Sequence, residues 1–244
     1  MKTIGKFTLF FLSLFTNTER FGVYVKRTID ECIQIGINSL IIVSIVSSFI
    51  GAVSAIQTAY NLISPLVPTY LISTIVRDMT ILELAPTILC VVLAGKVGSH
   101  IAGELGTMRI TEQIDALEVM GINSVSYLVL PKILAGFITI PALVTLAAFL
   151  SIGGGYLAST LTEIMTEEEY IYGIQYDFIT FSVPFAIIKS FVFAFLITSI
   201  SSFKGFYTRG GALEVGQAST SAVTNSCIAI LLADYLLSQL LLGH

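Results

Sequence analysis

The sequence predicts an all-α integral membrane protein with five transmembrane helices. It also predicts an N-terminal interfacial helix and an amphipathic cytoplasmic helix between spans two and three. Of the 244 residues, 55% are hydrophobic and 11% are charged, whereas soluble domains carry about 25% charged residues. The mean hydropathy is +0.90, and the apolar runs are long enough to cross a bilayer. Because lipid offers no hydrogen-bond partners to the backbone, these runs must be helices.

Residues 1–34 are predicted to form the N-terminal interfacial amphipathic helix. Lys2 and Lys6 precede the apolar stretch 7–15, an order that resembles a signal peptide. The stretch is short, has no Ala-x-Ala site and runs into the polar residues 16–20. We therefore expect an uncleaved helix with apolar residues in the lipid and basic residues toward the headgroups.

Residues 35–242 contain five segments that are apolar enough to span the membrane. The second span is the weakest because it contains three charged residues and Pro86. The third contains Pro141 and three glycines at 153–155, so we expect it to be tilted or broken. The spans are predicted near residues 35–59, 70–95, 128–158, 183–203 and 214–242.

Lys and Arg residues lie mainly on one side of these spans, and this asymmetry orients the chain. The loops on the opposite side hold at most Arg77, and the loop near 159–182 is acidic. The N-terminus and the 95–131 loop are therefore predicted to be cytoplasmic and the C-terminus periplasmic. The basic residues on the cytoplasmic side are Lys2, Lys6, Arg20, Lys26, Arg27, Lys96, Arg109, Lys132, Lys204 and Arg209.

Ionisable residues inside the predicted spans are candidates to line a cavity, because each costs about 2.5–3.5 kcal/mol on insertion scales. Lys189 and Asp234 are expected at similar depth on consecutive helices. We expect them to interact at a polar spot in an apolar pathway; a static pair that locks two helices is the alternative. Glu83 lies three residues before the helix-weakening Pro86 and is a candidate to line a cavity or to join helices.

Three weaker signals accompany these charges. Arg77 either forms an interfacial pair with Asp78 or reaches toward Glu83 if the helix is distorted. Gln57 lies near the outer end of span one and is more typical of a packing residue than of a ligand. The small residues from Gly51 to Ala55 permit close helix approach, which is a weak indication of dimerisation.

The loop 95–131 is unusually ordered for a membrane protein and is predicted to be a docking surface. Its acidic residues make simple resting on anionic headgroups unfavourable. A short amphipathic helix is expected, with its apolar face available to the bilayer or to a partner. Its apolar face comprises Ile110, Ile114, Leu117 and Gly121. Tight turns before it are expected at Gly98, Gly103 and Gly106.

Several kinds of site are not supported by the sequence. Gly95-Lys96 resembles the end of a phosphate-binding loop, but Cys90 and Val97 occupy the positions where that motif requires Gly and Ser or Thr. No Gly-x-Ser-x-Gly motif occurs. The two histidines belong to no metal or nucleophile cluster, and the three cysteines are expected to be packing residues. These residues are His100, His244, Cys32, Cys90 and Cys227.

Several motifs together resemble the signature of the MlaE-type permeases of ABC lipid transporters. The resemblance covers roughly residues 36–242 and is densest at 83–131. Its first part comprises Glu83-Leu-Ala-Pro86, Leu93-Ala-Gly-Lys-Val-Gly-Ser99, Gly103-Glu-Leu-Gly-Thr-Met-Arg-Ile-Thr-Glu-Gln113, Asp115-Ala-Leu-Glu-Val-Met-Gly121 and Leu130-Pro131. Its last part comprises Lys204-Gly205, Gly210-Gly-Ala212, Val215-Gly216, Ala218, Thr220 and Val223.

This resemblance implies the permease subunit of an ATP-driven ABC phospholipid transporter that acts between the inner and outer membranes of a bacterium. The chain would form a homodimer in the inner membrane, bind an ABC ATPase subunit and dock an MCE-domain periplasmic protein. It would have no catalytic residue, metal or cofactor of its own. The coupling helix that holds the ATPase would involve Glu104, Arg109, Glu112, Gln113, Asp115, Leu117, Glu118 and Met120.

The resemblance also implies that a charged cluster lies near the lipid cavity at Glu83, Lys189 and Asp234. Some relatives carry Arg immediately before the Glu-Leu-Gly-Pro motif, whereas this chain has Leu82. Arg77 is a candidate substitute, and Gln57 completes the intramembrane polar set. Two other functions stay open: a gradient-driven secondary transporter or channel that uses these charges as a relay, and a membrane scaffold.

Overall fold

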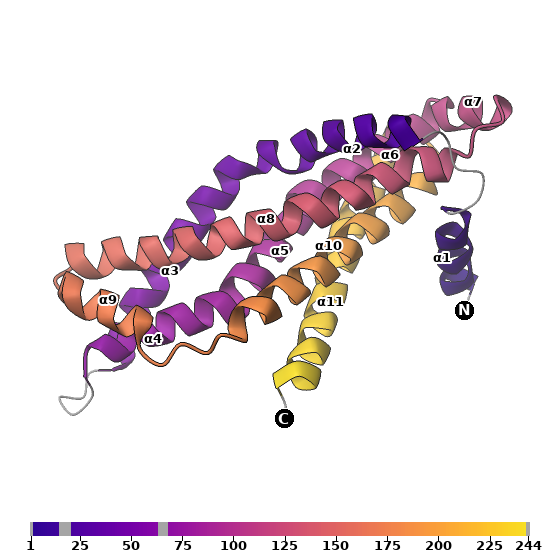
Figure 1. Ribbon diagram of the computed structural model, residues 1–244. Coiled ribbons are helices and arrows are strands. Elements are labelled where there is room, and N and C mark those ends of the chain that lie inside the picture. Colours follow the sequence, from indigo (N-terminus) through magenta and orange to yellow (C-terminus); the bar gives the residue numbers. More distant parts are fainter. Residues whose placement is uncertain (1, 15–20, 63–67, 243–244) are drawn as a thin grey trace. The chain divides into compact units, whose positions relative to one another are not determined.

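The computed structural model describes residues 2–14, 21–62 and 68–242, and in these ranges every regular element is a helix (Figure 1). The order is α1 (Lys2–Ser13), α2 (Phe21–Ile35), η1 (Ile37–Ser39), α3 (Leu40–Asn61), α4 (Tyr70–Met79), η2 (Thr80–Ile88), α5 (Leu89–Leu93), η3 (Ala94–Gly98), α6 (Ser99–Ile110), α7 (Gln113–Val119), α8 (Ser124–Leu161), α9 (Glu167–Gln175), α10 (Ser182–Phe206) and α11 (Ala212–Leu242).

Within the described ranges, five helical stretches are long and apolar enough to cross a membrane, which confirms the predicted fold class. The N-terminal region contains two helices, α1 and α2, where the sequence predicted one; its interfacial position stays a prediction. The five stretches are Gly22–Asn61, Tyr70–Ile110, Ser124–Leu161, Ser182–Phe206 and Ala212–Leu241.

The chain folds as two compact units. Helices α5, α8, α10 and α11 contribute residues to both of them. Unit 1 comprises Met1–Ser39, Val91–Ile140 and Phe191–Leu236, and unit 2 comprises Leu40–Cys90, Pro141–Ser190 and Leu237–His244.

The expected turns at Gly98, Gly103 and Gly106 are wrong, because the second helical stretch continues to Ile110. These glycines bring helices of unit 1 close together instead. A Cβ at Gly98 would lie 2.9 Å from the hydroxyl of Ser201 on α10, and one at Gly106 would lie 3.2 Å from a methyl of Val215 on α11. Small residues at such positions permit close helix packing.

The third span was expected to be tilted or broken. The break is wrong, since α8 runs from Ser124 to Leu161 without interruption, and the tilt stays a prediction. In unit 2, its glycines serve a close contact with α3. A Cβ on Gly154 would overlap the backbone carbonyl of Ser48, and a Cβ on Gly51 would overlap that of Ser151. The small residues of span one therefore pack within the chain.

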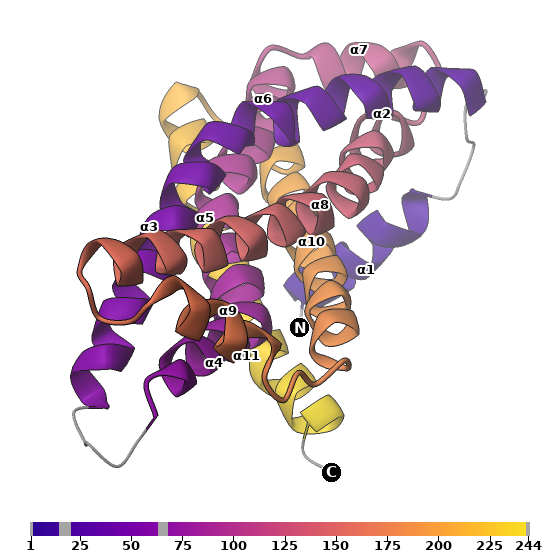
Figure 2. The same cartoon turned by 60° about the vertical axis from the view of Figure 1, so that its left-hand side comes forward.

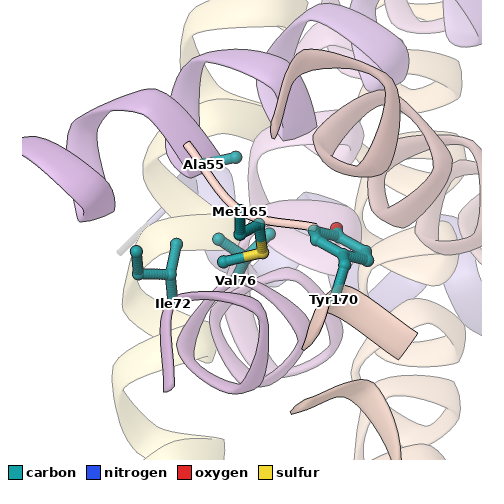
Figure 3. Close-up of a cluster of buried hydrophobic side chains, with 5 residues drawn as sticks. All are labelled: Ala55, Ile72, Val76, Met165 and Tyr170. Carbon is teal, nitrogen blue, oxygen red and sulfur yellow. The ribbon is translucent and has the colours of Figure 1, made fainter. Parts of the chain in front are cut away.

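Helix α9, which the sequence analysis did not predict, lies beside α4 in unit 2 (Figure 2). Its signal was Thr166 followed three residues later by Glu169, which form a capping box. Hydrogen bonds from the Thr166 backbone N–H and the Thr69 hydroxyl hold the pKa of Glu169 below its ordinary value. Ala55, Ile72, Val76, Met165 and Tyr170 form a buried cluster that joins α9 to α3 and α4 (Figure 3).

Helix α1 packs on the last turns of α10 in unit 1 through aromatic side chains. Phe10 is buried, and its ring lies 5.6 Å from that of Phe203 and 5.5 Å from that of Phe206. The ring of Phe11 lies 5.2 Å from that of Phe195 in an edge-to-face arrangement. Such aromatic pairs stabilise beyond their buried area, so α1 is anchored to the helices of unit 1.

Candidate functional site

The structure pairs Lys189 of α10 with Glu83 of η2 inside unit 2. The Lys189 ammonium lies 3.0 Å from the Glu83 carboxylate, and it also lies 4.8 Å from the ring centroid of Phe185. Its side chain is 1% exposed, whereas that of Glu83 is 48% exposed. The pair therefore presents a half-accessible carboxylate that is fixed by a buried cation.

Pro86 explains why this pair forms where it does. In an α-helix the carbonyl of Leu82 would accept from the backbone N–H of residue 86, but proline has none. The segment η2 is π-helical around this point, and π segments are frequent at functional sites. In the i→i+5 pattern of a π-helix, the Leu82 carbonyl is assigned to the backbone N–H of residue 87 instead. The Lys189 ammonium donates to the same carbonyl at 3.0 Å, so one buried cation binds both this carbonyl and the Glu83 carboxylate.

Arg77 is held at the end of α9. Its side chain is 2% exposed, and Nε donates to the Asp78 carboxylate at 2.8 Å. Its Nη1 donates to the carbonyls of Ile174 and Tyr176 at 2.7 and 2.8 Å. These carbonyls belong to the last turn of α9 and its C-cap, where helix carbonyls lack intrahelical partners. Of the two predicted roles of Arg77, the pair with Asp78 is therefore present, and the guanidinium also fixes α9 to α4.

Replacing Arg77 with Lys is expected to destabilise the protein by about 2 kcal/mol, because an ammonium cannot reproduce the guanidinium fork and leaves carbonyls unpaired. Thermal unfolding in detergent and protease cleavage of the 174–180 segment measure the effect. Asp78→Asn is the matched control: it removes a partly exposed ion-pair partner but keeps the carbonyl bonds, so its effect is expected to be under about 1 kcal/mol. Equal effects would contradict this role of Arg77.

The remaining predicted polar residues lie elsewhere. Gln57 is exposed on α3 and lines a shallow depression of about 290 Å³ together with Val53 and Leu84. Asp234 is half-buried on α11 in unit 1, whereas Lys189 belongs to unit 2. The contact between Lys189 and Asp234 stays a prediction.

The coupling segment predicted from the sequence is tied to α6 in unit 1. Arg109 on α6 donates to the Asp115 carboxylate on α7 at 2.7 Å and lies 3.9 Å from that of Glu118. Glu112, which precedes α7, has a left-handed backbone with φ 59°. Gln113 donates to the Thr111 hydroxyl at 3.1 Å. A single arginine thus sets the angle between α6 and α7.

The apolar face of α7 is less accessible than the sequence analysis predicted. Ile114 is fully buried and Leu117 is half-buried, so this face packs on the chain itself. The apolar side chains left for a partner are Val119, which is 89% exposed, and Met120, which is 65% exposed. The helical period identified the face correctly but not which residues stay accessible.

Glu104 belongs to an ion cluster that the sequence analysis did not identify. The ammonium of Lys132 on α8 lies 2.6 Å from the Glu104 carboxylate on α6 and 2.5 Å from that of Glu31 on α2. Lys132 is 1% exposed. It had been counted only as a basic loop residue, and the signal available was its position directly after Pro131, at the edge of an apolar run. The cluster joins three helices of unit 1.

Across the described residues, no three His, Cys, Asp or Glu side chains gather as metal ligands. Cys32, Cys90 and Cys227 are free thiols.

Comparison with known proteins identifies the relatives of this chain. The family described as Permease MlaE matches residues 28–240. A probable ABC transporter permease protein of Rickettsia bellii is 38% identical over 98% of this chain and 92% of its own length. A probable ABC transporter permease protein of Synechocystis is 34% identical over 88% of this chain and 82% of its own length.

A plant relative extends the comparison. The chloroplastic protein TRIGALACTOSYLDIACYLGLYCEROL 1 of Arabidopsis thaliana is 32% identical over 89% of this chain and 62% of its own length. The family match, the extent of the bacterial relatives and the five membrane-crossing helices agree. This chain belongs to the MlaE permease family and is a multi-pass membrane subunit of a transporter.

Proposed function

We propose that the chain is the permease subunit of an ATP-driven ABC transporter that moves phospholipids between the inner and outer membranes of a bacterium. An ABC ATPase subunit would bind on the cytoplasmic side and an MCE-domain protein on the periplasmic side. Phospholipids need an apolar path with a small polar patch. The half-exposed Glu83, fixed by Lys189, supplies a polar patch within an apolar span.

The geometry of α7 is the observation that carries the ATP-driven mechanism. This short helix ends in two exposed apolar side chains, Val119 and Met120, and Arg109 ties it to α6. The helical stretch from Tyr70 to Ile110 is continuous and contains Glu83. A displacement imposed on α7 by an ATPase would therefore pass along one helical stretch to the polar patch.

A homodimer would cover the exposed side of α11. Only 17% of the most apolar window in this helix is buried within the chain. Its exposed residues recur at helical spacing, at Leu213, Gln217, Thr220, Thr224, Ile228, Leu231 and Tyr235. A contiguous exposed face of this kind in a membrane helix suits contact with another helix. A second copy of the chain is the proposed occupant.

The lipid substrate is supported by chemistry and by one relative. The name of the Arabidopsis relative contains that of a glycolipid built on diacylglycerol. Purification in mild detergent tests the whole proposal: an ATPase, an MCE-domain protein and extractable phospholipid should accompany the chain. Gradient-driven flux by the chain alone would instead indicate a secondary transporter or channel. Partners without bound lipid would indicate a scaffold.

Replacing Val119 and Met120 with Asp is expected to release the ATPase. Interface hot-spot residues contribute about 2 kcal/mol or more each, so affinity should fall roughly thirtyfold for one replacement and about a thousandfold for both. Co-purification and lipid-stimulated ATP hydrolysis measure the loss. The control is Thr107→Asp, which adds the same charge at an exposed position on α6 and should retain the ATPase. If the double variant keeps both the ATPase and lipid movement, α7 is not the coupling element.

A further inference from the structure

A cavity of about 570 Å³ lies in unit 2, between α4 with η2, α8, the first turns of α10 and the segment 174–178. Its volume falls in the range of small-molecule and cofactor sites, about 300–1,000 Å³. Of the intramembrane polar residues predicted from the sequence, Arg77 lines this cavity. Gln57 lines the shallow depression described above, and neither Glu83 nor Lys189 lines the cavity. This cavity is therefore distinct from the Glu83–Lys189 pair.

The walls of the cavity accept hydrocarbon rather than a headgroup. Most lining side chains are apolar, as at Ile81, Phe149 and Ile187. Of the three polar lining residues, Gln175 is exposed at the end of α9, and Arg77 and Thr145 are already engaged. Arg77 donates to Asp78 and to the carbonyls at the end of α9, and the Thr145 hydroxyl donates to the carbonyl of Ala142. A phosphate or carboxylate inside the cavity would lack donors.

The cavity has a polar end and an apolar end. Arg77 and Ile152 mark one end, because Arg77 binds the carbonyls of α9 and the Ile152 carbonyl accepts from Tyr170 of α9. Val144 lies eight residues from Ile152 along α8, which corresponds to about 12 Å, and Ala85 lies eight residues from Arg77 on the facing helix. Gln175, exposed at the end of α9, stands at the rim of the polar end. This shape is a slot open to a polar rim.

We propose that this cavity binds one acyl chain of a phospholipid, with the chain end toward Ala85 and Val144 and the glycerol end near Gln175. The inference rests on the proposed function and adds to it a hydrocarbon subsite inside the single chain. The acyl chain belongs either to a transported lipid or to a lipid that stays bound from the surrounding bilayer.

Photocrosslinking tests the proposal on the complete transporter in nanodiscs. The probes are two phosphatidylcholines, one with a diazirine near the end of an acyl chain and one with a diazirine near the glycerol. The first should label the chain at Ala85 and Val144, and the second at Gln175 and Phe178. Ala148→Phe fills the slot from α8 and should abolish this labelling. The control is Ala142→Phe, an exposed position on the same helix that does not line the cavity, and it should leave labelling unchanged.

Labelling that is equal in the two variants, or that does not depend on the position of the diazirine, would overturn the proposal. Lipid transfer between vesicles separates the two sources. Loss of transfer in Ala148→Phe but not in Ala142→Phe indicates a transported lipid, and normal transfer with lost labelling indicates a bound bilayer lipid. If the unaltered transporter moves no lipid while the labelling pattern holds, the proposed function fails and the acyl-chain site stands.

Discussion

Replacing Lys132 with Met is expected to lower the free energy of unfolding by about 3–5 kcal/mol, the usual result of removing one partner from a buried ion pair. Met matches the length of the lysine stem, so the loss is electrostatic rather than a cavity. Two carboxylates, Glu31 and Glu104, then face each other with no cation between them. Because they lie on α2 and α6, their repulsion acts directly on the helix that leads into α7.

Two further variants isolate this effect. Lys26→Met changes an exposed lysine of α2 and should alter stability by less than about 0.5 kcal/mol. Combining Lys132→Met with Glu31→Gln and Glu104→Gln removes all three charges and should restore most of the loss, because neutral replacement of a buried ion cluster is often tolerated. Thermal or denaturant unfolding in detergent gives the values. If the loss of stability persists in the triple variant, it arises from altered packing and not from the unpaired charges.

The parts of the fold that follow from composition could be predicted, and those that depend on packing partners could not. Five spans follow because apolar length and lipid leave the backbone no other solution. The turns expected at Gly98 and Gly106 are wrong, because a glycine allows either a turn or a close helix contact. Only the neighbouring helix decides between the two. The break expected in the helix that contains Pro141 does not occur for the same reason. A proline weakens a helix, but the surrounding contacts determine whether the helix breaks.

The candidate site, like the fold, could be predicted only in part from the sequence. Burial costs identified Lys189 and Glu83 as residues that need partners, but sequence spacing did not reveal that they pair with each other. Leu82 offered no side-chain signal at all, because its backbone carbonyl is what the lysine binds. Pro86 was visible in the sequence as a helix-weakening residue, but the sequence did not show that the helix responds with a π-helical segment. Lys132 was hidden by its place at the end of a polar loop.

Replacing Lys189 with Met is expected to reduce ATP-dependent lipid transfer by at least about tenfold, which corresponds to ~1.4 kcal/mol in the barrier. The substitution removes the lysine hydrogen bond to the Leu82 carbonyl, which is worth about 1.5–3 kcal/mol for a charged donor, and releases the Glu83 carboxylate. Because Glu83 is 48% exposed, its carboxylate is not enclosed within the chain when the lysine is lost, and the subunit should still assemble with its ATPase. Transfer and ATPase co-purification are the two measurements.

Lys189→Arg and the exchange of Glu83→Lys with Lys189→Glu separate the two roles of the lysine. Arginine keeps both the charge and a donor for the Leu82 carbonyl, so transfer should largely persist. The exchange restores an ion pair, but a carboxylate at position 189 cannot donate to that carbonyl. If pairing alone matters, the exchanged protein transfers lipid; if the hydrogen bond to the Leu82 carbonyl is needed, the exchanged protein assembles without transfer. Full transfer by Lys189→Met would exclude both roles, because neither the ion pair nor the donor would then be needed.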